Sequence, residues 1–135
     1  MTPFSLKIVT PDGAKFDGEV EEVVVRTTTG DLGIQAGHIS CVAPLGMGRA
    51  MIIADGAKRY AACIGGMISV ISGEALIVAT TFEWADQIDV DRAEASAQKA
   101  QQVLSDKNAS QTDIRMAEAR LKRALVRKGV AADPK

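Results

Sequence analysis

The chain has 135 residues, of which 47% are hydrophobic, 24% charged and 4% aromatic, and this length allows one full domain or one small domain with an appendage. Sixteen basic and seventeen acidic residues give a net charge of −1, which argues against a general polyanion-binding protein. No apolar run approaches the roughly 20 residues that span a bilayer. Because two cysteines, Cys41 and Cys63, are too few for a disulfide framework and the N-terminus has no signal-like segment, we expect a reduced cytosolic protein.

Residues 1–84 are predicted to form a β domain, since eleven of the twelve glycines lie at or before Gly73 and β-branched residues are frequent. Strand patterns occupy residues 4–9, 20–26, 47–54, 57–64, 67–71 and 75–81. The dipeptides at 55–56 (Asp-Gly) and 72–73 (Ser-Gly) separate the last four strands into two hairpins. Because no helix pattern interrupts these strands, they predict an antiparallel β-sandwich or flattened barrel.

Residues 88–130 are predicted to form two helices, followed by a tail at 131–135. Asp89 can cap the first helix, on which Ala93, Ala97, Ala100 and Leu104 recur at helical spacing. After a polar loop, with Thr112 or Asp113 as the expected cap, the second helix has an apolar stripe of Ile114, Ala117, Leu121, Ala124 and Leu125. Two such helices predict an antiparallel hairpin that alanine holds only weakly, because alanine buries little apolar area.

Basic residues concentrate on the second predicted helix, since positions 115–135 contain seven basic and two acidic residues. This excess is typical of a solvated helix face, and the alternative is a surface for an acidic partner or for phosphates. On the first helix, Arg92 and Lys99 share one flank, and on the second helix Arg123 and Arg127 do so. Antiparallel packing would bring these four cations together around an anion such as a nucleoside triphosphate.

Catalytic and metal-binding patterns are weak. Cys41 follows the only histidine, His38, by three residues, and no orienting acid is evident nearby. One histidine and two separated cysteines lack the spacing of metal ligands, and no GxxxxGK[ST] phosphate loop occurs. We therefore expect a non-catalytic protein without a metal site, and keep a thiol enzyme centred on Cys41 and His38 as an alternative.

Two motifs connect the chain with a known family. Residues 30–38, GDLGIQAGH, resemble the G-(D/E)-L-G-I-x-P-G-H signature of the epsilon subunit of bacterial F-type ATP synthases, with Ala36 in place of the usual proline. Residues 88–93, IDVDRA, are similar to the (I/L)-D-x-x-R-A nucleotide-binding motif of that family. The resemblance covers essentially the whole chain, and its order of parts is that of a β domain followed by a helical hairpin.

The resemblance implies a ten-stranded β-sandwich and a hairpin in a non-catalytic rotor subunit. Such a subunit binds the gamma subunit and the c-ring at the cytoplasmic face of the bacterial cell membrane, as a peripheral protein. The hairpin would act as a switch that permits turnover when it is folded on the sandwich. Extended along gamma towards the alpha/beta head, it would inhibit ATP hydrolysis. ATP, with or without magnesium, would act as a regulatory ligand of the folded form and not as an obligatory cofactor.

The resemblance also assigns residues to these roles. It implies an ATP site at Glu83, Ile88, Asp89, Arg92, Ala93, Lys99, Arg123 and Arg127. Lysine at position 99 departs from the arginine of close ATP-binding relatives, and its point charge cannot reproduce the guanidinium fork.

A loop would face gamma and the c-ring through Asp31, Leu32, Gly33, Ile34 and His38. The extended hairpin would present to an acidic surface of the beta subunit the residues Arg115, Lys122, Arg123 and Arg127. Two alternatives stay open, namely the same subunit with a hairpin that is insensitive to nucleotide, and a protein-binding adaptor unrelated to nucleotide.

Overall fold

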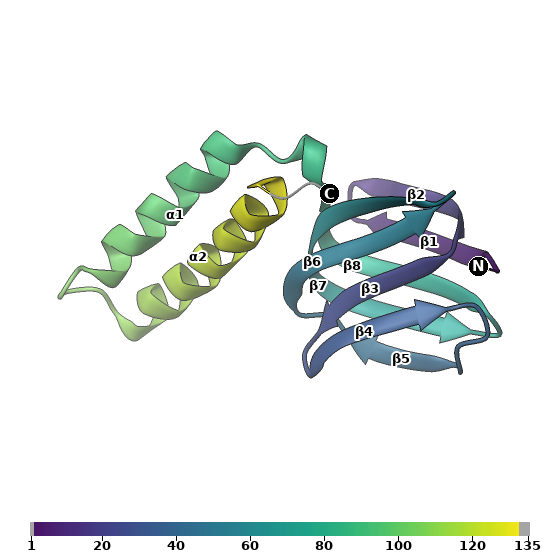
Figure 1. Ribbon diagram of the computed structural model, residues 1–135. Coiled ribbons are helices and arrows are strands. Elements are labelled where there is room, and N and C mark those ends of the chain that lie inside the picture. The colour runs from purple at the N-terminus through teal and green to yellow at the C-terminus, as the bar shows by residue number, and fades with distance from the viewer. Residues whose placement is uncertain (1, 133–135) are drawn as a thin grey trace.

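The computed structural model describes residues 2–132, which form a β-sandwich followed by a helical hairpin (Figure 1). The strands are β1 (Phe4–Thr10), β2 (Gly13–Val20), β3 (Glu22–Thr27), β4 (Gly30–Gln35), β5 (Cys41–Pro44), β6 (Met47–Ala54), β7 (Ala57–Ile71) and β8 (Glu74–Trp84). A short 3-10 helix, η1 (Ala85–Gln87), leads to the helices α1 (Val90–Leu104) and α2 (Gln111–Ala132). Neither helix is long and apolar enough to cross a membrane. The predicted tail begins inside α2, and its last three residues lie outside the described part of the chain.

The sandwich has eight strands in the described residues, in the order β2-β1-β8-β7-β6-β3-β4, with β5 paired to β7. Ten had been expected. The segments predicted as separate strands at 57–64 and 67–71 form one continuous strand, because β7 bends at Gly65 and Gly66 without leaving the sheet. Both glycines have positive φ values, +69° and +102°, and a Cβ at Gly66 would lie 1.9 Å from the Val78 carbonyl oxygen. The bend is therefore possible only with glycine.

Both predicted hairpin turns are confirmed. Asp55 and Gly56 join β6 to β7, and Ser72 and Gly73 join β7 to β8, and all four residues have positive φ. The pairing of the strands is antiparallel, as predicted, except between β1 and β8, which run parallel. Strands β2, β4 and β5 had no clear strand pattern in the sequence.

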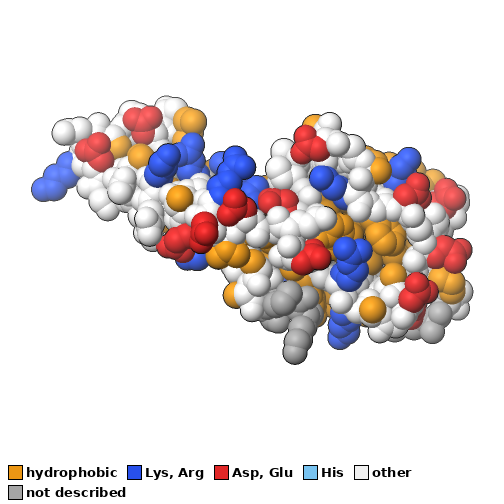
Figure 2. Space-filling model, turned by 90° about the horizontal axis from the view of Figure 1, so that it is seen from above, with side chains coloured by type: hydrophobic (Ala, Val, Ile, Leu, Met, Phe, Trp, Pro, Cys, Tyr) orange, Lys and Arg blue, Asp and Glu red, His pale blue; other side chains and the backbone are white. Residues whose placement is uncertain are grey.

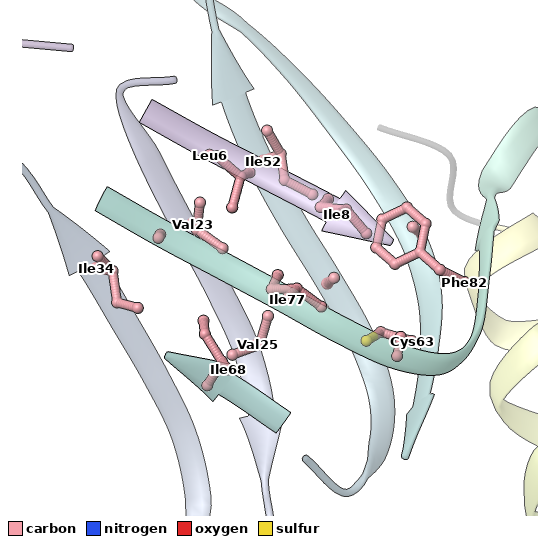
Figure 3. Close-up of a cluster of buried hydrophobic side chains, with 14 of the residues drawn as sticks. Leu6, Ile8, Val23, Val25, Ile34, Ile52, Cys63, Ile68, Ile77 and Phe82 are labelled. Carbon is pink, nitrogen blue, oxygen red and sulfur yellow. The ribbon is translucent and has the colours of Figure 1, made fainter. Parts of the chain in front are cut away.

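The core of the sandwich is a continuous cluster of aliphatic and aromatic side chains from both layers (Figure 3). Leu6, Ile8, Ile52, Ile68 and Ile77 are fully buried within it. The alternation of Phe4, Leu6 and Ile8 that predicted β1 thus reflects an inward face.

Both cysteines are free. Cys63 lies in the core, where burial raises the pKa of its thiol to about 12, and Cys41 is half-buried. The Cys63 thiol is therefore protonated near neutral pH.

The two helices begin at side-chain caps. The Asp89 carboxylate accepts a hydrogen bond from the Arg92 backbone N–H at 3.0 Å, as predicted. The cap of α2 is Ser110 rather than Thr112 or Asp113. The Ser110 hydroxyl accepts from the Asp113 N–H at 3.0 Å, and the Asp113 carboxylate accepts from the Ser110 N–H at 3.4 Å. This reciprocal capping box places the cap two to three residues earlier than expected.

The helices pack antiparallel along a narrow interface of small side chains. Ala93, Ala97 and Ala100 of α1 are buried, as are Ala117 and Ala124 of α2. Leu104 and Leu125, which had been assigned to the two stripes, are 36% and 51% exposed. For Leu125 the reason is geometric, because it lies about 100° around the helix from Ala124.

The hairpin contacts the sandwich through one end only. Helix α2 packs on β6, β7 and η1, and the connection between α1 and α2 is the part of the hairpin farthest from the sandwich (Figure 1). At the near end, Val130 and Ile88 pack on Ala62 of β7, next to Tyr60 and Val126. The near end of the hairpin therefore determines how α2 sits on the sandwich.

Candidate functional site

An ion pair joins the last turns of α2 to the end of β8. The Arg127 Nε atom donates to the Glu83 carboxylate at 2.5 Å, and both side chains are only about one-quarter to one-third exposed. These two residues belong to the predicted ATP site and are 44 positions apart in the sequence. The fold thus brings the second-helix arginine to the end of the β domain.

A second ion pair closes the same end of the hairpin. The Lys128 ammonium group contacts the Glu94 carboxylate, linking α2 to the first turns of α1. Its hydrogen bond and positive charge lower the pKa of Glu94 below its ordinary value. The basic end of α2 therefore lies beside residues 83–94.

Three residues of the predicted nucleotide motif take part in the hairpin's own structure. Ile88 packs on Val130, Asp89 caps α1, and Ala93 is buried in the helix interface. Arg92 and Lys99 are exposed on α1. The structure brings Glu83 into contact with Arg127, but it does not place Arg92 and Lys99 in the hollow that the α2 arginines line.

That hollow, which we call the basic cleft, lies between α2 and the strands β3, β6 and β7 and has a volume of about 1340 Å³. Its charged lining consists of five basic residues and one acidic residue, namely Arg26, Arg49, Lys122, Arg123, Arg127 and Asp31. Figure 2 shows basic and acidic side chains side by side where the hairpin meets the sandwich. The basic cleft therefore carries a clear excess of positive charge.

The cations on the sandwich wall of the basic cleft have neighbours. The Arg26 Nε atom lies 3.1 Å from an oxygen of the Asp31 carboxylate, and the Arg49 guanidinium lies 4.4 Å from the centre of the Tyr60 ring. Neither Arg26 nor Arg49 was predicted from the sequence to belong to a site. Nothing in the local pattern distinguishes them from other strand arginines.

The surface that was predicted to face gamma and the c-ring lies mainly on the edge strand β4 and not in a loop. Asp31, Leu32 and Gly33 belong to β4 and are at least partly accessible, as is His38 in the following turn. Ile34 is 1% exposed and belongs to the sandwich core, so its side chain cannot contact a partner there. Alternation along the strand turns this one position inward.

Exposed apolar side chains mark a further candidate interface that was not predicted from the sequence. Val42 of β5, Met67 of β7 and Val78 of β8 lie next to one another across the outward face of the sheet. Ile39, in the turn before β5, is 78% exposed. The signal was present in the sequence, because both faces of β7 and β8 carry apolar residues, but a buried second layer explains such a pattern equally well.

The arrangement of Cys41 and His38 does not support thiol catalysis. The Cys41 sulfur lies 4.0 Å from His38 Nδ1, but that nitrogen is also 2.7 Å from the Ile39 carbonyl oxygen. A carbonyl oxygen only accepts, so Nδ1 carries the proton and cannot take one from the thiol. Among residues 2–132, no group of three histidine, cysteine or acidic side chains is placed to hold a metal ion.

The structure is that of a small two-part protein, a β-sandwich followed by an antiparallel helical hairpin. Two family models match, the β-sandwich domain of the ATP synthase delta/epsilon chain over residues 3–85 and its long α-helix domain over residues 86–131. The ATP synthase epsilon chain of Bacillus pumilus is 42% identical over 131 residues, covering 97% of this chain and 98% of its own. That of Bacillus subtilis is 44% identical over 115 residues, covering 85% and 86%. The chain belongs to the delta/epsilon chain family of ATP synthases.

Solved structures confirm the fold. A chain of the Euglena gracilis mitochondrial ATP synthase superposes with a TM-score of 0.83 at 20% identity, covering 98% of this chain and 82% of that one. A chain from the Tetrahymena thermophila enzyme gives 0.65 at 14% identity, covering 94% and 95%. The predicted family and the order of sandwich and hairpin are therefore confirmed, and the chain is a non-catalytic subunit of ATP synthase.

Proposed function

We propose that the chain works in the rotor of the enzyme at the cytoplasmic face of the bacterial membrane, coupling proton translocation to ATP synthesis, with its sandwich against the gamma subunit and the c-ring. The similar Tetrahymena chain comes from a structure of the central stalk and c-ring. In this chain, the edge strand β4 exposes Asp31, and the outward sheet face exposes Val42 and Met67. A polar edge beside an apolar face is a composition suited to a protein interface.

We further propose that the hairpin regulates ATP hydrolysis and that ATP favours its folded form. The observation that carries this proposal is the contact between Arg127 and Glu83, which sets the basic end of α2 against the end of β8, a few residues before the nucleotide motif. Arg123 lies one turn earlier on the same helix and has no carboxylate partner in the described part of the chain. A triphosphate beside these residues would supply the missing negative charge.

Population shift is the mechanism of this regulation. A ligand that binds only the folded hairpin stabilises it by about 2.7 kcal/mol when its free concentration is about a hundredfold above Kd. The interface between the helices consists mainly of Ala93, Ala97 and Ala100 and buries little apolar area. A stabilisation of this size is therefore enough to determine whether the hairpin is folded or extended.

Loss of ATP would release α2 from the sandwich and expose its basic side chains. Arg115 and Lys122 are exposed already, whereas Arg123 and Arg127 are half-buried against the sandwich. Extension of the hairpin would therefore add two cations to the surface that meets an acidic face of the beta subunit, and binding there would block hydrolysis. Electrostatic complementarity would favour that contact.

Calorimetric titration of the full chain with ATP tests the nucleotide site. Substituting Arg92 and Arg123 by alanine together should abolish measurable binding, because two charge-assisted contacts to phosphate are lost. Arg115→Ala, which removes one charge from the exposed part of α2, is the control and should bind as the unmodified chain does. Equal ATP binding by the double variant would refute the assignment.

The alternative of a nucleotide-insensitive hairpin predicts a different result for the unmodified chain. Its melting temperature would be the same with and without ATP, and calorimetry would record no binding. The regulatory proposal requires both measurements to respond to ATP.

A further inference from the structure

The basic cleft has one wall on α2 and one on the sandwich, and basic side chains line both walls. Lys122, Arg123 and Arg127 come from the helix, and Arg26 and Arg49 come from β3 and β6. We propose that the basic cleft is a polyphosphate site shared by the two parts of the molecule, in which Arg26 and Arg49 hold the same phosphate chain as Arg123. The proposal rests on the proposed nucleotide regulation and adds the sandwich residues to it.

Charge balance favours a multivalent anion in the basic cleft. The Asp31 and Glu83 carboxylates pair with Arg26 and Arg127. No described carboxylate pairs with Lys122 or Arg123. Cations that share one cleft repel each other, and a phosphate chain with several charges removes this repulsion.

The sandwich wall is built so that its arginines are presented to the basic cleft. The chain has glycine at position 48, opposite Arg26, and a Cβ there would lie 2.6 Å from the Arg26 Cβ atom. Gly48 thereby leaves room for the Arg26 side chain to cross β6. The Arg49 guanidinium lies 4.4 Å from the centre of the Tyr60 ring, a contact that restricts where this group can lie. Guanidinium groups held in this way suit bidentate contacts to phosphate oxygens.

The inner wall of the basic cleft supplies further polar atoms. Thr28 and Thr29 are exposed in the turn between β3 and β4 that lines it. The Thr81 hydroxyl, of a residue on the same wall, is buried without a hydrogen-bond partner among the described residues, and such groups are uncommon in folded proteins.

A ligand in the basic cleft would link the hairpin to the sandwich, which a ligand bound to the hairpin alone would not do. By contacting Arg26 and Arg123 at once, it would tie α2 directly to the sandwich. Such a ligand binds only when α2 is docked, so its whole binding free energy favours the folded form. The same phosphate chemistry is offered by a nucleoside triphosphate and by inorganic tripolyphosphate, which differ in the base and sugar.

Titration of the full chain with tripolyphosphate and with ATP, at low ionic strength, tests the proposal. Arg26→Gln should weaken the binding of both compounds about tenfold, the loss expected for one charge-assisted contact. Arg120→Gln is the matched control, because it removes the same charge from an exposed position of α2 outside the basic cleft. Its binding should change by about twofold or less.

Two further readouts separate this proposal from the proposed function. Tripolyphosphate should slow amide hydrogen exchange at residues 122–130 in the unmodified chain but not in Arg26→Gln. The melting temperature of Arg26→Gln without ligand should be nearly unchanged.

Failure of tripolyphosphate to bind, or equal binding by Arg26→Gln, overturns the shared site. If ATP still binds in that case and the Arg92 and Arg123 double variant does not bind it, the hairpin site stands without the sandwich. If only Arg26→Gln weakens ATP binding, the shared site stands and the motif assignment falls.

Discussion

The sandwich and the hairpin bury different kinds of side chain. The sandwich core holds fully buried leucine, isoleucine and valine residues such as Leu6 and Ile77, together with Phe82 and Trp84. The interface between α1 and α2 buries mainly alanines. Since a large aliphatic side chain contributes about 1.5–3 kcal/mol when it is buried, the sandwich is the stable platform. Under the proposed function, the weakly packed hairpin is the part whose position a ligand or a partner would change.

The contact between the hairpin and the sandwich is also small. On the sandwich side, α2 packs mainly on β6 and β7, and one of its arginines reaches the end of β8. The polar contact there is the pair of Arg127 with Glu83, and the apolar contact is Val130 with Ala62. With so few contacts to a 22-residue helix, the proposed release of the hairpin would leave the core of the sandwich intact.

The largest expected effect comes from the platform. Ile77→Ala should lower the free energy of unfolding of the sandwich by about 2–5 kcal/mol, because it leaves a cavity in the core. Chemical denaturation measures this change. Val78→Ala, at the next and outward-facing position, should cost within about 0.5 kcal/mol. Similar losses at the two positions would contradict the assigned inward and outward faces.

An intermediate effect is expected in the helix interface. Ala97→Leu should destabilise the closed hairpin by about 1–3 kcal/mol, because a larger side chain cannot fit where the helices approach closely. Amide exchange should become faster within residues 90–132 and stay unchanged in the core strands. Ala95→Leu, on the exposed side of α1, should change neither region. Faster exchange throughout the sandwich would show that the two parts are not independent.

The smallest effect concerns pH. Lys128 lowers the pKa of Glu94 in the folded hairpin relative to the ordinary value of 4.5. The pair therefore stabilises the hairpin above about pH 4.5, and this contribution is lost as the pH falls through the lowered pKa. Protection factors of α1 amides should fall between pH 6 and pH 3 more in the unmodified chain than in Glu94→Gln. Glu118→Gln, on the exposed side of α2, is the control and should follow the unmodified chain.

Local patterns in the sequence determined much of the architecture. Alternating residues predicted β1, the Asp-Gly and Ser-Gly dipeptides predicted two hairpins, and Asp89 predicted the start of α1. These features depend on residues within a few positions of each other, so the sequence contains the physical cause directly. The two motifs also identified the family, which the family models confirm.

Only the tertiary structure decided the features that depend on distant residues. The bend at Gly65 and Gly66 joins two predicted strands because their neighbours in β8 continue through it. Ile34 turns inward because β4 pairs with β3 over the core. The contact of Arg127 with Glu83 follows from where α2 docks on the sandwich. So does the placement of Arg26 beside the α2 arginines. That docking position results from packing and charge over the whole molecule, which no short segment of sequence specifies.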